Sequence, residues 1–346
     1  MKSNITPKIK EKVGKNLHNQ KNHPLEIIKN KIYEYFDKKF NCTFKKYDDL
    51  NPIVSVEDNF DKLLIEKDHP SRRTSDTYYI NKHQVLRTHT SAHQNNLMEI
   101  GIQKFLVTGD VYRKDEIDKC HYPVFHQTEG VCIVEKNENA EKSLKDTLSG
   151  LIEFLFPNCE YHFKADYFPF TNPSFEVEIK FNGEWLEILG CGIIQKQILK
   201  NCKIENSIGW AFGLGLERLA MILFNIPDIR YFWSTDERFL KQFKDGKIIE
   251  FKAYSKYPAS ERDISFWVSN TYCYNDFCEI IRENGGDLIE NIILIDEFTH
   301  PKTNRESKCF RITYRSNDRS LIAEEIDDIQ KTIRLSAEKK LKVEIR

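Results

Sequence analysis

The sequence has no long apolar run, and this absence argues against a membrane-spanning helix, which needs about 20 consecutive apolar residues. It also has no C-x-x-C pair. Its nine cysteines are scattered along the chain, which argues against both a disulfide framework and a structural zinc site, so we expect reduced thiols in a reducing compartment. The formal net charge is only -1, so no basic field over the whole chain indicates a nucleic-acid partner.

Two common phosphate-binding motifs are missing as well. No G-x-x-x-x-G-K-[ST] sequence occurs, which excludes a P-loop. The stretch from Gly213 to Arg218 begins like a dinucleotide-binding G-x-G-x-x-G motif, but Arg218 replaces the third glycine. A helix that begins after two glycines and carries an arginine in its first turn can still bind phosphate, through free backbone N–H groups and the guanidinium.

The chain of 346 residues is long enough for one large domain and one small one, and its 40% of hydrophobic residues supplies an ample core. Residues 1–22 differ from the rest, because they contain six lysines against one acidic residue, Glu11. We interpret this basic segment as a flexible, solvated tail. A transit peptide or an arm that contacts RNA are the alternatives, although the segment contains no arginine.

Residues 105–133 contain the most informative pattern. Apolar residues alternate on both sides of a charged loop, which predicts two strands joined by that loop. Because side chains in a strand alternate between faces, one face gathers a guanidinium, an aromatic ring, an amide and a carboxylate. A solvated face would also be polar, but this mixture favours a face that binds a ligand. The side chains are those of Arg113, Phe125, Gln127 and Glu129.

A second strand pair carries acidic side chains. Asn182-Gly183 is a preferred two-residue hairpin turn, because both residues tolerate positive φ, and counting outward from it places Glu178 opposite Glu187. Like charges in this position repel by about several tenths of a kcal/mol, so a cation should offset them. Lys180 and a magnesium ion delivered with a nucleotide are the two candidates. The acidic face carries Glu176, Glu178 and Glu187.

Two shorter segments have ordinary structural interpretations. In residues 89–94, Ser91 and Gln94 fit a capping box at the start of a helix, and the two histidines there lack the glutamate of a zinc-binding H-E-x-x-H motif. Phe168 and Phe170 lie two apart in a segment that its prolines keep extended. Such a ring pair is usually part of the core, and it lines a pocket only if its face is open.

The C-terminal quarter predicts a separate small domain. Strands and helices are expected in the order β-α-β-β-α-β over residues 254–346, which is a ferredoxin-like arrangement that by itself names no function. The polar residues 244–253 are the predicted linker, and residues 23–243 form the predicted larger domain. The fold class that follows is α+β.

These motifs resemble the class II aminoacyl-tRNA synthetases. The R-x-D and F-x-x-x-E patterns between Arg113 and Glu129 resemble motif 2 of that class, and the segment from Gly213 to Arg218 resembles motif 3. From about His69 to the end, longer blocks resemble the single-chain phenylalanyl-tRNA synthetases of organelles. These blocks include DHPSRR, HYPVFHQTEG, FPFTNPSFEVEI, GWAFGLGLERLAMI and YPASERDISFW.

The resemblance implies an antiparallel catalytic sheet flanked by helices and a C-terminal anticodon-binding domain. It implies that L-phenylalanine and ATP form phenylalanyl-adenylate, which is transferred to the 2′-hydroxyl of the terminal adenosine of tRNA(Phe). ATP is then a substrate, Mg²⁺ a cofactor, and the protein a monomer of the mitochondrial matrix or another organelle. No stretch of the chain has room for an editing domain, and no membrane partner is expected.

The resemblance also assigns roles to residues. Arg113 would hold the α-phosphate, Arg218 the γ-phosphate and Glu187 magnesium, with Glu176 and Glu178 as further metal candidates. Asp115 stands where the class usually has the longer glutamate, so a water is expected to bridge it to adenine. The amino-acid site would comprise His89, Ser91, Phe125, Gln127, Glu129, Phe168, Phe170 and Ala211. The ATP site would comprise Arg113, Asp115, His121, Phe125 and Arg218.

Two other functions remain open on the sequence alone. One is an adenylate-forming enzyme of the same fold that does not use tRNA, which would lack the C-terminal domain. The other is a non-catalytic RNA-binding relative, which would have lost Arg113 or Arg218. The modular organisation further predicts that removing the C-terminal domain abolishes tRNA charging but spares adenylate formation.

Overall fold

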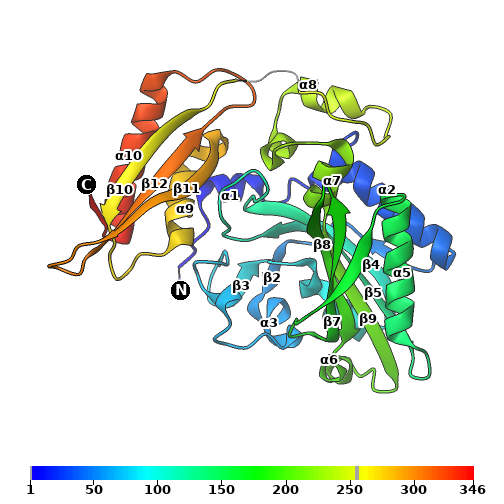
Figure 1. The fold of residues 1–346 in the computed structure, drawn as a ribbon. Helices are drawn as coiled ribbons and strands as arrows, with labels where there is room; N and C mark the ends of the chain where they lie inside the picture. The colour runs from blue at the N-terminus through cyan, green and yellow to red at the C-terminus, as the bar shows by residue number, and fades with distance from the viewer. Residues whose placement is uncertain (1, 254–256) are drawn as a thin grey trace.

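The chain folds around two main β-sheets, seen in a computed structural model that describes residues 2–253 and 257–346 (Figure 1). The larger sheet has seven strands in the order β1-β4-β5-β9-β8-β7-β6, and the smaller has four in the order β11-β12-β10-β13. Only β1 and β4 pair in parallel; the other neighbours in the described sheets are antiparallel. The predicted α+β class is confirmed.

The strands of the larger sheet are β1 (Lys45–Tyr47), β4 (Lys104–Tyr112), β5 (Val124–Glu135), β6 (Tyr161–Asp166), β7 (Thr171–Phe181), β8 (Glu184–Ile194) and β9 (Ser207–Gly215). A two-stranded sheet pairs β2 (Ile53–Ser55) with β3 (Gln84–Leu86). The accompanying helices are α1 (Pro7–Lys12), α2 (Pro24–Phe40), α3 (Val56–Asn59), α4 (Gln94–Glu99), α5 (Ala140–Leu155), α6 (Lys196–Asn201), α7 (Leu216–Phe224) and α8 (Glu237–Leu240).

The two faces of the larger sheet have different cover because side chains alternate along each strand. On β9, Trp210 and Phe212 belong to the main core, which they share with apolar residues of α2, α5 and α7. Ala211 points to the opposite face, where α4 and α6 supply a smaller apolar cluster. These two short helices cover only part of that face, so the rest is free to form a binding site.

The N-terminal segment differs from the flexible tail that its composition predicts. It forms α1 and a 3-10 turn, with Ile9, Leu17 and His18 buried against the larger domain. The backbone N–H of Gly14 donates to the Asp110 carboxylate on β4 at 3.1 Å. Two buried apolar residues among many lysines give no helical periodicity, which is why the sequence pattern did not predict this packing.

The C-terminal part has the predicted β-α-β-β-α-β order. Its elements are β10 (Ser260–Trp267), α9 (Tyr274–Gly285), β11 (Ile289–Thr299), β12 (Glu306–Tyr314), α10 (Ala323–Leu341) and β13 (Glu344–Ile345). Gly286 ends α9 with a φ of 57°, as expected for a glycine at this position. The predicted start of this domain, at residue 254, lies outside the described residues.

Two further findings bear on the expectations from composition. Within residues 2–253 and 257–346, no helix has both the length and the apolar character that crossing a bilayer requires. All nine cysteines are free thiols.

The buried N-terminal segment yields a stability prediction. Ile9→Ala should lower the free energy of unfolding by about 2–4 kcal/mol, because Ile9 is only 1% exposed and its truncation leaves a cavity. Lys10→Ala, on the exposed side of the same helix, should change it by less than about 0.5 kcal/mol. Urea unfolding measures both, and equal effects would show that the segment does not pack as described.

Candidate active site

Two adjoining cavities lie on the open face of the larger sheet. The larger has a volume of about 590 Å³ and the smaller about 240 Å³. They share part of their walls, so a ligand could extend from one into the other. The shared lining residues are Arg113, Asp115, Gln127, Glu187, Gly190 and Gly213.

The cavities exist because glycines lie opposite polar side chains in the sheet. Glu129 on β5 pairs with Gly213 on β9, which in turn pairs with Gly190 on β8. Gln127 likewise pairs with Gly215. A Cβ atom added at Gly213 or Gly215 would meet no described atom within 4 Å. Protein packing therefore does not require glycine at these positions, whereas a ligand lying on the strands would.

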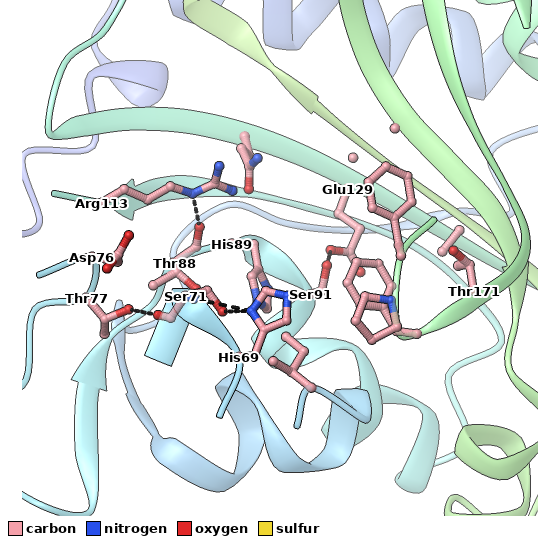
Figure 2. A pocket seen from close by; sticks show the side chains of 18 of the residues that line it. His69, Ser71, Asp76, Thr77, Thr88, His89, Ser91, Arg113, Glu129 and Thr171 are labelled. Carbon is pink, nitrogen blue, oxygen red and sulfur yellow. Dashed lines mark hydrogen bonds between the residues drawn. The ribbon is translucent and has the colours of Figure 1, made fainter. Parts of the chain in front are cut away.

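Glu129 is held by the segment that the sequence pattern predicts to be a helix cap. The Ser91 hydroxyl donates to Glu129 Oε2 (Figure 2). Thr90 Oγ1 lies 3.5 Å from the same oxygen. No side-chain capping bond forms at either helix start there, so the capping-box interpretation of Ser91 is wrong. Ser91 instead orients a buried carboxylate at the cavity wall.

The other oxygen of that carboxylate is buried and unpaired within the described part of the chain. Glu129 is 2% exposed, and its Oε1 atom has no hydrogen-bond partner among the described residues. Burial raises the pKa of Glu129 to about 8, and the hydrogen bonds from Ser91 and Thr90 offset that rise only in part. A buried acceptor without a partner is costly, so a cationic or hydrogen-bonding ligand would be bound strongly here.

Arg113 begins the loop after β4 and lies between the two cavities. Its Nε atom donates to the Thr88 carbonyl at 2.9 Å (Figure 2). Its guanidinium lies 5.2 Å from the centre of the Phe125 ring. Neither contact uses the hydrogen-bonding capacity of the Nη1 and Nη2 atoms of the guanidinium. Burial, and next the charge of Arg113, lower the pKa of His89 to about 3, so this histidine is neutral at physiological pH.

The paired phenylalanines line the larger cavity. The Phe168 and Phe170 rings are stacked, with centroids 5.9 Å apart and planes inclined by 12°. The Phe168 ring lies against Gly190, where a Cβ atom would approach it to 2.9 Å. Ala211, only 6% exposed, also lines this cavity. The ring pair therefore lines a pocket, and Phe170 also packs against two apolar clusters of the core.

The smaller cavity holds the second arginine. Arg218 Nη1 donates to the Glu187 carbonyl at 2.9 Å and lies 3.7 Å from the Glu187 carboxylate. The preceding residue, Glu217, anchors the start of α7 to β5, since it accepts from the backbone N–H of His126 at 2.8 Å and binds its ring at 2.6 Å. Phe125 and His121 line the same cavity.

The acidic hairpin has the predicted register but different cations. Glu178 pairs with Glu187 across the β7-β8 hairpin, as predicted. Lys180 does not offset the charges, because it binds Glu160. Lys164 of the neighbouring strand β6 supplies the positive charge beside Glu176 and Glu178, and Arg218 lies beside Glu187. Glu178 lies 3.1 Å from Lys164 and 2.9 Å from His162, and Glu176 lies 3.6 Å from Lys164.

This arrangement separates the three metal candidates. Only Glu187 lines the cavities, whereas Glu176 and Glu178 line neither. Burial, and next the charge of Glu187, raise the pKa of Glu176. Within the described parts of the chain, no group of three or more His, Cys, Asp or Glu side chains could hold a metal ion. A site shared by all three glutamates is thus not formed by the protein alone.

Every other predicted site residue lines one of the two cavities. His89, Ser91, Glu129, Phe168, Phe170 and Ala211 line the larger, Phe125, His121 and Arg218 the smaller, and Arg113, Asp115, Gln127 and Glu187 both. Phe125, predicted for both substrates, is found only at the smaller cavity.

The structure adds lining residues that the sequence pattern did not identify. His69 and Ser71 come from the DHPSRR block, whose resemblance could have pointed to them, and their side chains hydrogen-bond each other at 2.8 Å (Figure 2). Thr171, at the start of β7, also lines the larger cavity. Asn275 belongs to α9 of the C-terminal part, and no local signal places it at this site.

Comparisons with known proteins agree with this geometry. Residues 6–243 match the class II core domain of tRNA synthetases, and residues 255–346 match the ferredoxin-fold anticodon-binding domain. The chain is 50% identical to the chloroplastic/mitochondrial phenylalanine–tRNA ligase of Arabidopsis thaliana, over 99% of this chain and 83% of that protein. It is 47% identical to the mitochondrial phenylalanine–tRNA ligase of Mus musculus (99% and 86%) and 38% identical to that of Saccharomyces cerevisiae (99% and 92%).

The raised pKa of Glu129 yields a pH-dependent stability prediction. Between the unfolded pKa of about 4.3 and the folded pKa of about 8, the folded state binds more protons, so stability falls as pH rises. Glu129→Gln removes that loss. The decrease in melting temperature from pH 5 to pH 8 should therefore be smaller in this variant than in the unmodified protein. The two decreases should differ by at least ~3 °C.

Glu135→Gln, at the exposed end of the same strand, is the matched control and should follow the unmodified protein. Parallel melting profiles for Glu129→Gln and the unmodified protein over this pH range would contradict the assignment.

Proposed function

Because the chain belongs to the phenylalanine–tRNA ligases of the class II aminoacyl-tRNA synthetase family, we propose that its two adjoining cavities bind L-phenylalanine and ATP side by side. The larger cavity takes the amino acid and the smaller the triphosphate. The observation that carries this proposal is the buried Glu129 carboxylate, whose Oε1 atom has no partner among the described residues and which lines the same cavity as Phe168, Phe170 and Arg113.

The amino acid would be recognised at both ends. Its ammonium group would pair with Glu129 Oε1, with the neutral His89, Ser91 and Gln127 as neighbouring polar groups. Its phenyl ring would enter beside Phe168 and Phe170, where edge-to-face contact is favourable. Ala211 would form the floor of this apolar part. The polar groups thus fix the orientation, and the rings select an aromatic side chain.

The first reaction then follows from the placement of the arginines. The carboxylate of phenylalanine would attack the α-phosphorus of ATP, and pyrophosphate would leave. Arg113 would hold the α-phosphate and Arg218 the γ-phosphate, a role supported by their positions on the smaller cavity. Fixed donors at the transferring phosphoryl group favour the transition state without reorganisation. The adenylate formed in this way would acylate the 2′-hydroxyl of the terminal adenosine of tRNA(Phe).

Asp115 and His121 would border the nucleotide. Asp115 lines both cavities, and its short side chain leaves room for a water between it and adenine. A hydrogen bond to Asp118 raises the pKa of His121, which favours its cationic form beside a phosphate. Phe125, stacked near Arg113, would add an aromatic surface.

Class II synthetases use ATP, generally with Mg²⁺. Glu187 suits an ion that arrives with ATP, since Mg²⁺ is commonly held by one or two carboxylates together with substrate phosphates. Its side chain is 47% exposed and lines both cavities. When bound, the ion would neutralise part of the phosphate charge.

The second partner would be tRNA(Phe), bound through the C-terminal part. The match of residues 255–346 to an anticodon-binding domain supports this and disfavours an adenylate-forming enzyme that does not use tRNA. The relatives are mitochondrial or chloroplastic/mitochondrial proteins, so we place this enzyme in the same organelles. We propose that it acts as a monomer.

Amino-acid-dependent ATP–pyrophosphate exchange tests the proposal. Among the twenty amino acids, phenylalanine should support the fastest exchange. Arg218→Ala should lower kcat/KM by roughly 100-fold or more, because it removes a donor to developing phosphate charge. Arg319→Ala, which removes an exposed guanidinium of the C-terminal part, should leave the exchange unchanged. A preference for another amino acid, or no exchange at all, would refute the assignment.

A further inference from the structure

The loop between β4 and β5, residues 113–123, is bound by the C-terminal part over consecutive peptide groups. Asn275 Nδ2 donates to the Lys114 carbonyl at 3.3 Å. Arg282 Nη2 donates to the carbonyls of residues 115 and 116, at 2.6 and 3.4 Å. The backbone N–H of Ile292 donates to the Ile117 carbonyl at 3.2 Å. All carbonyls from residue 114 to residue 117 therefore accept hydrogen bonds from the C-terminal part.

The side chains of the loop are anchored to the same part. Ile117 is only 8% exposed and belongs to the apolar core of the C-terminal part, which also contains Phe266 and Phe310. Lys114, also 8% exposed, lies 3.4 Å from Asp276 on α9. The loop is thus bound through both backbone and side chains to a different domain from the one whose strands it connects.

Arg282 is itself held in place from both sides. Its Nη1 atom donates to the Glu279 carboxylate at 2.7 Å, and the Tyr78 hydroxyl donates to the same oxygen at 2.9 Å. Tyr78 belongs to the larger domain and is fully buried, while Glu279 and Arg282 lie on α9. Through the Glu279 carboxylate, Tyr78 of the larger domain is therefore linked to the guanidinium that binds the loop backbone.

The position of the loop matters because its first residues line the cavities. Arg113 and Asp115 border both of them, and Asn275 borders the larger. Asp115 is shorter than the glutamate usual in this class, so its reach toward a nucleotide depends more strongly on where its backbone lies. A displacement of about 1 Å at such a position can cost on the order of 100-fold in rate.

We propose that Arg282 and Asn275 are positioning residues for adenylate formation: they fix the backbone of residues 114–116 and thereby hold Asp115 and Arg113 against the nucleotide. This inference rests on the proposed function, since it assumes that the nucleotide binds at these residues. It departs from the modular prediction that the larger domain alone suffices for adenylate formation. The C-terminal part serves the first reaction as well as tRNA binding.

Arg282→Met and Asn275→Ala in the full chain, assayed by phenylalanine-dependent pyrophosphate exchange, test this role. Both variants should raise the KM for ATP, Arg282→Met by roughly tenfold or more, with the KM for phenylalanine changed by less than about threefold. Arg282→Lys, which retains a cationic donor, should restore part of the loss. A purely structural defect would not separate the two KM values or respond to the conservative variant.

Arg334→Met is the matched control, because Arg334 donates to the Asp263 carbonyl at 3.0 Å within the C-terminal part, away from the loop. The inference is overturned if Arg282→Met and Arg334→Met give the same KM for ATP. It is also overturned if the KM values for ATP and phenylalanine rise together. If circular dichroism shows that Arg282→Met does not fold, the half-exposed Asn275→Ala decides by the same criterion. Absence of phenylalanine-dependent exchange in the unmodified enzyme would instead refute the proposed function.

Discussion

The register in which β5, β9 and β8 pair is the constraint on which the site depends. It sets Glu129 beside Gly213, and Gly213 beside Gly190. The acidic side chain is therefore next to two positions on the neighbouring strands that carry no side chain. A shift by one residue would turn Glu129 into the core beneath α2, α5 and α7 and bring bulky residues such as Phe212 to the open face. Packing of the core on one face therefore fixes the chemistry of the other.

The same register produces two energetically unfavourable features at the site, an unpaired carboxylate oxygen and an uncovered apolar wall. A buried carboxylate with one oxygen unpaired among the described residues is energetically costly, and the stacked Phe168 and Phe170 rings form an apolar wall of the same cavity. A phenylalanine zwitterion would relieve both costs at once, because its ammonium pairs with the oxygen and its ring covers the wall. Under the proposed function, both contacts would favour binding of phenylalanine.

Features governed by local rules could be predicted from the sequence. The Asn182-Gly183 turn fixes the pairing of Glu178 with Glu187, and strand alternation places Gln127 and Glu129 on one face. The order of elements in the C-terminal part also follows from local periodicity. The residues that line the cavities do not follow from local rules alone. The resemblance to the family's motifs points to them, because only the folded sheet brings these side chains together.

Features that depend on distant partners could not be predicted. Ser91 fits a helix cap by spacing, yet its hydroxyl donates to the Glu129 carboxylate on β5. The lysine beside Glu178 comes from β6, a strand whose position cannot be obtained by counting residue pairs from the hairpin turn. The N-terminal segment is likewise buried by residues far away in the chain. The hydrogen bonds from Arg282 to the loop between β4 and β5 also join distant segments.

A crystal structure with a non-hydrolysable analogue of phenylalanyl-adenylate tests the central claim most directly. The account predicts the analogue's ammonium nitrogen at hydrogen-bond distance, about 3 Å, from Glu129 Oε1, and its ring beside Phe168 and Phe170. The group that replaces the phosphate should lie against Arg113. An analogue bound with its ammonium group away from Glu129, or with its backbone not lying over Gly213, would contradict the account.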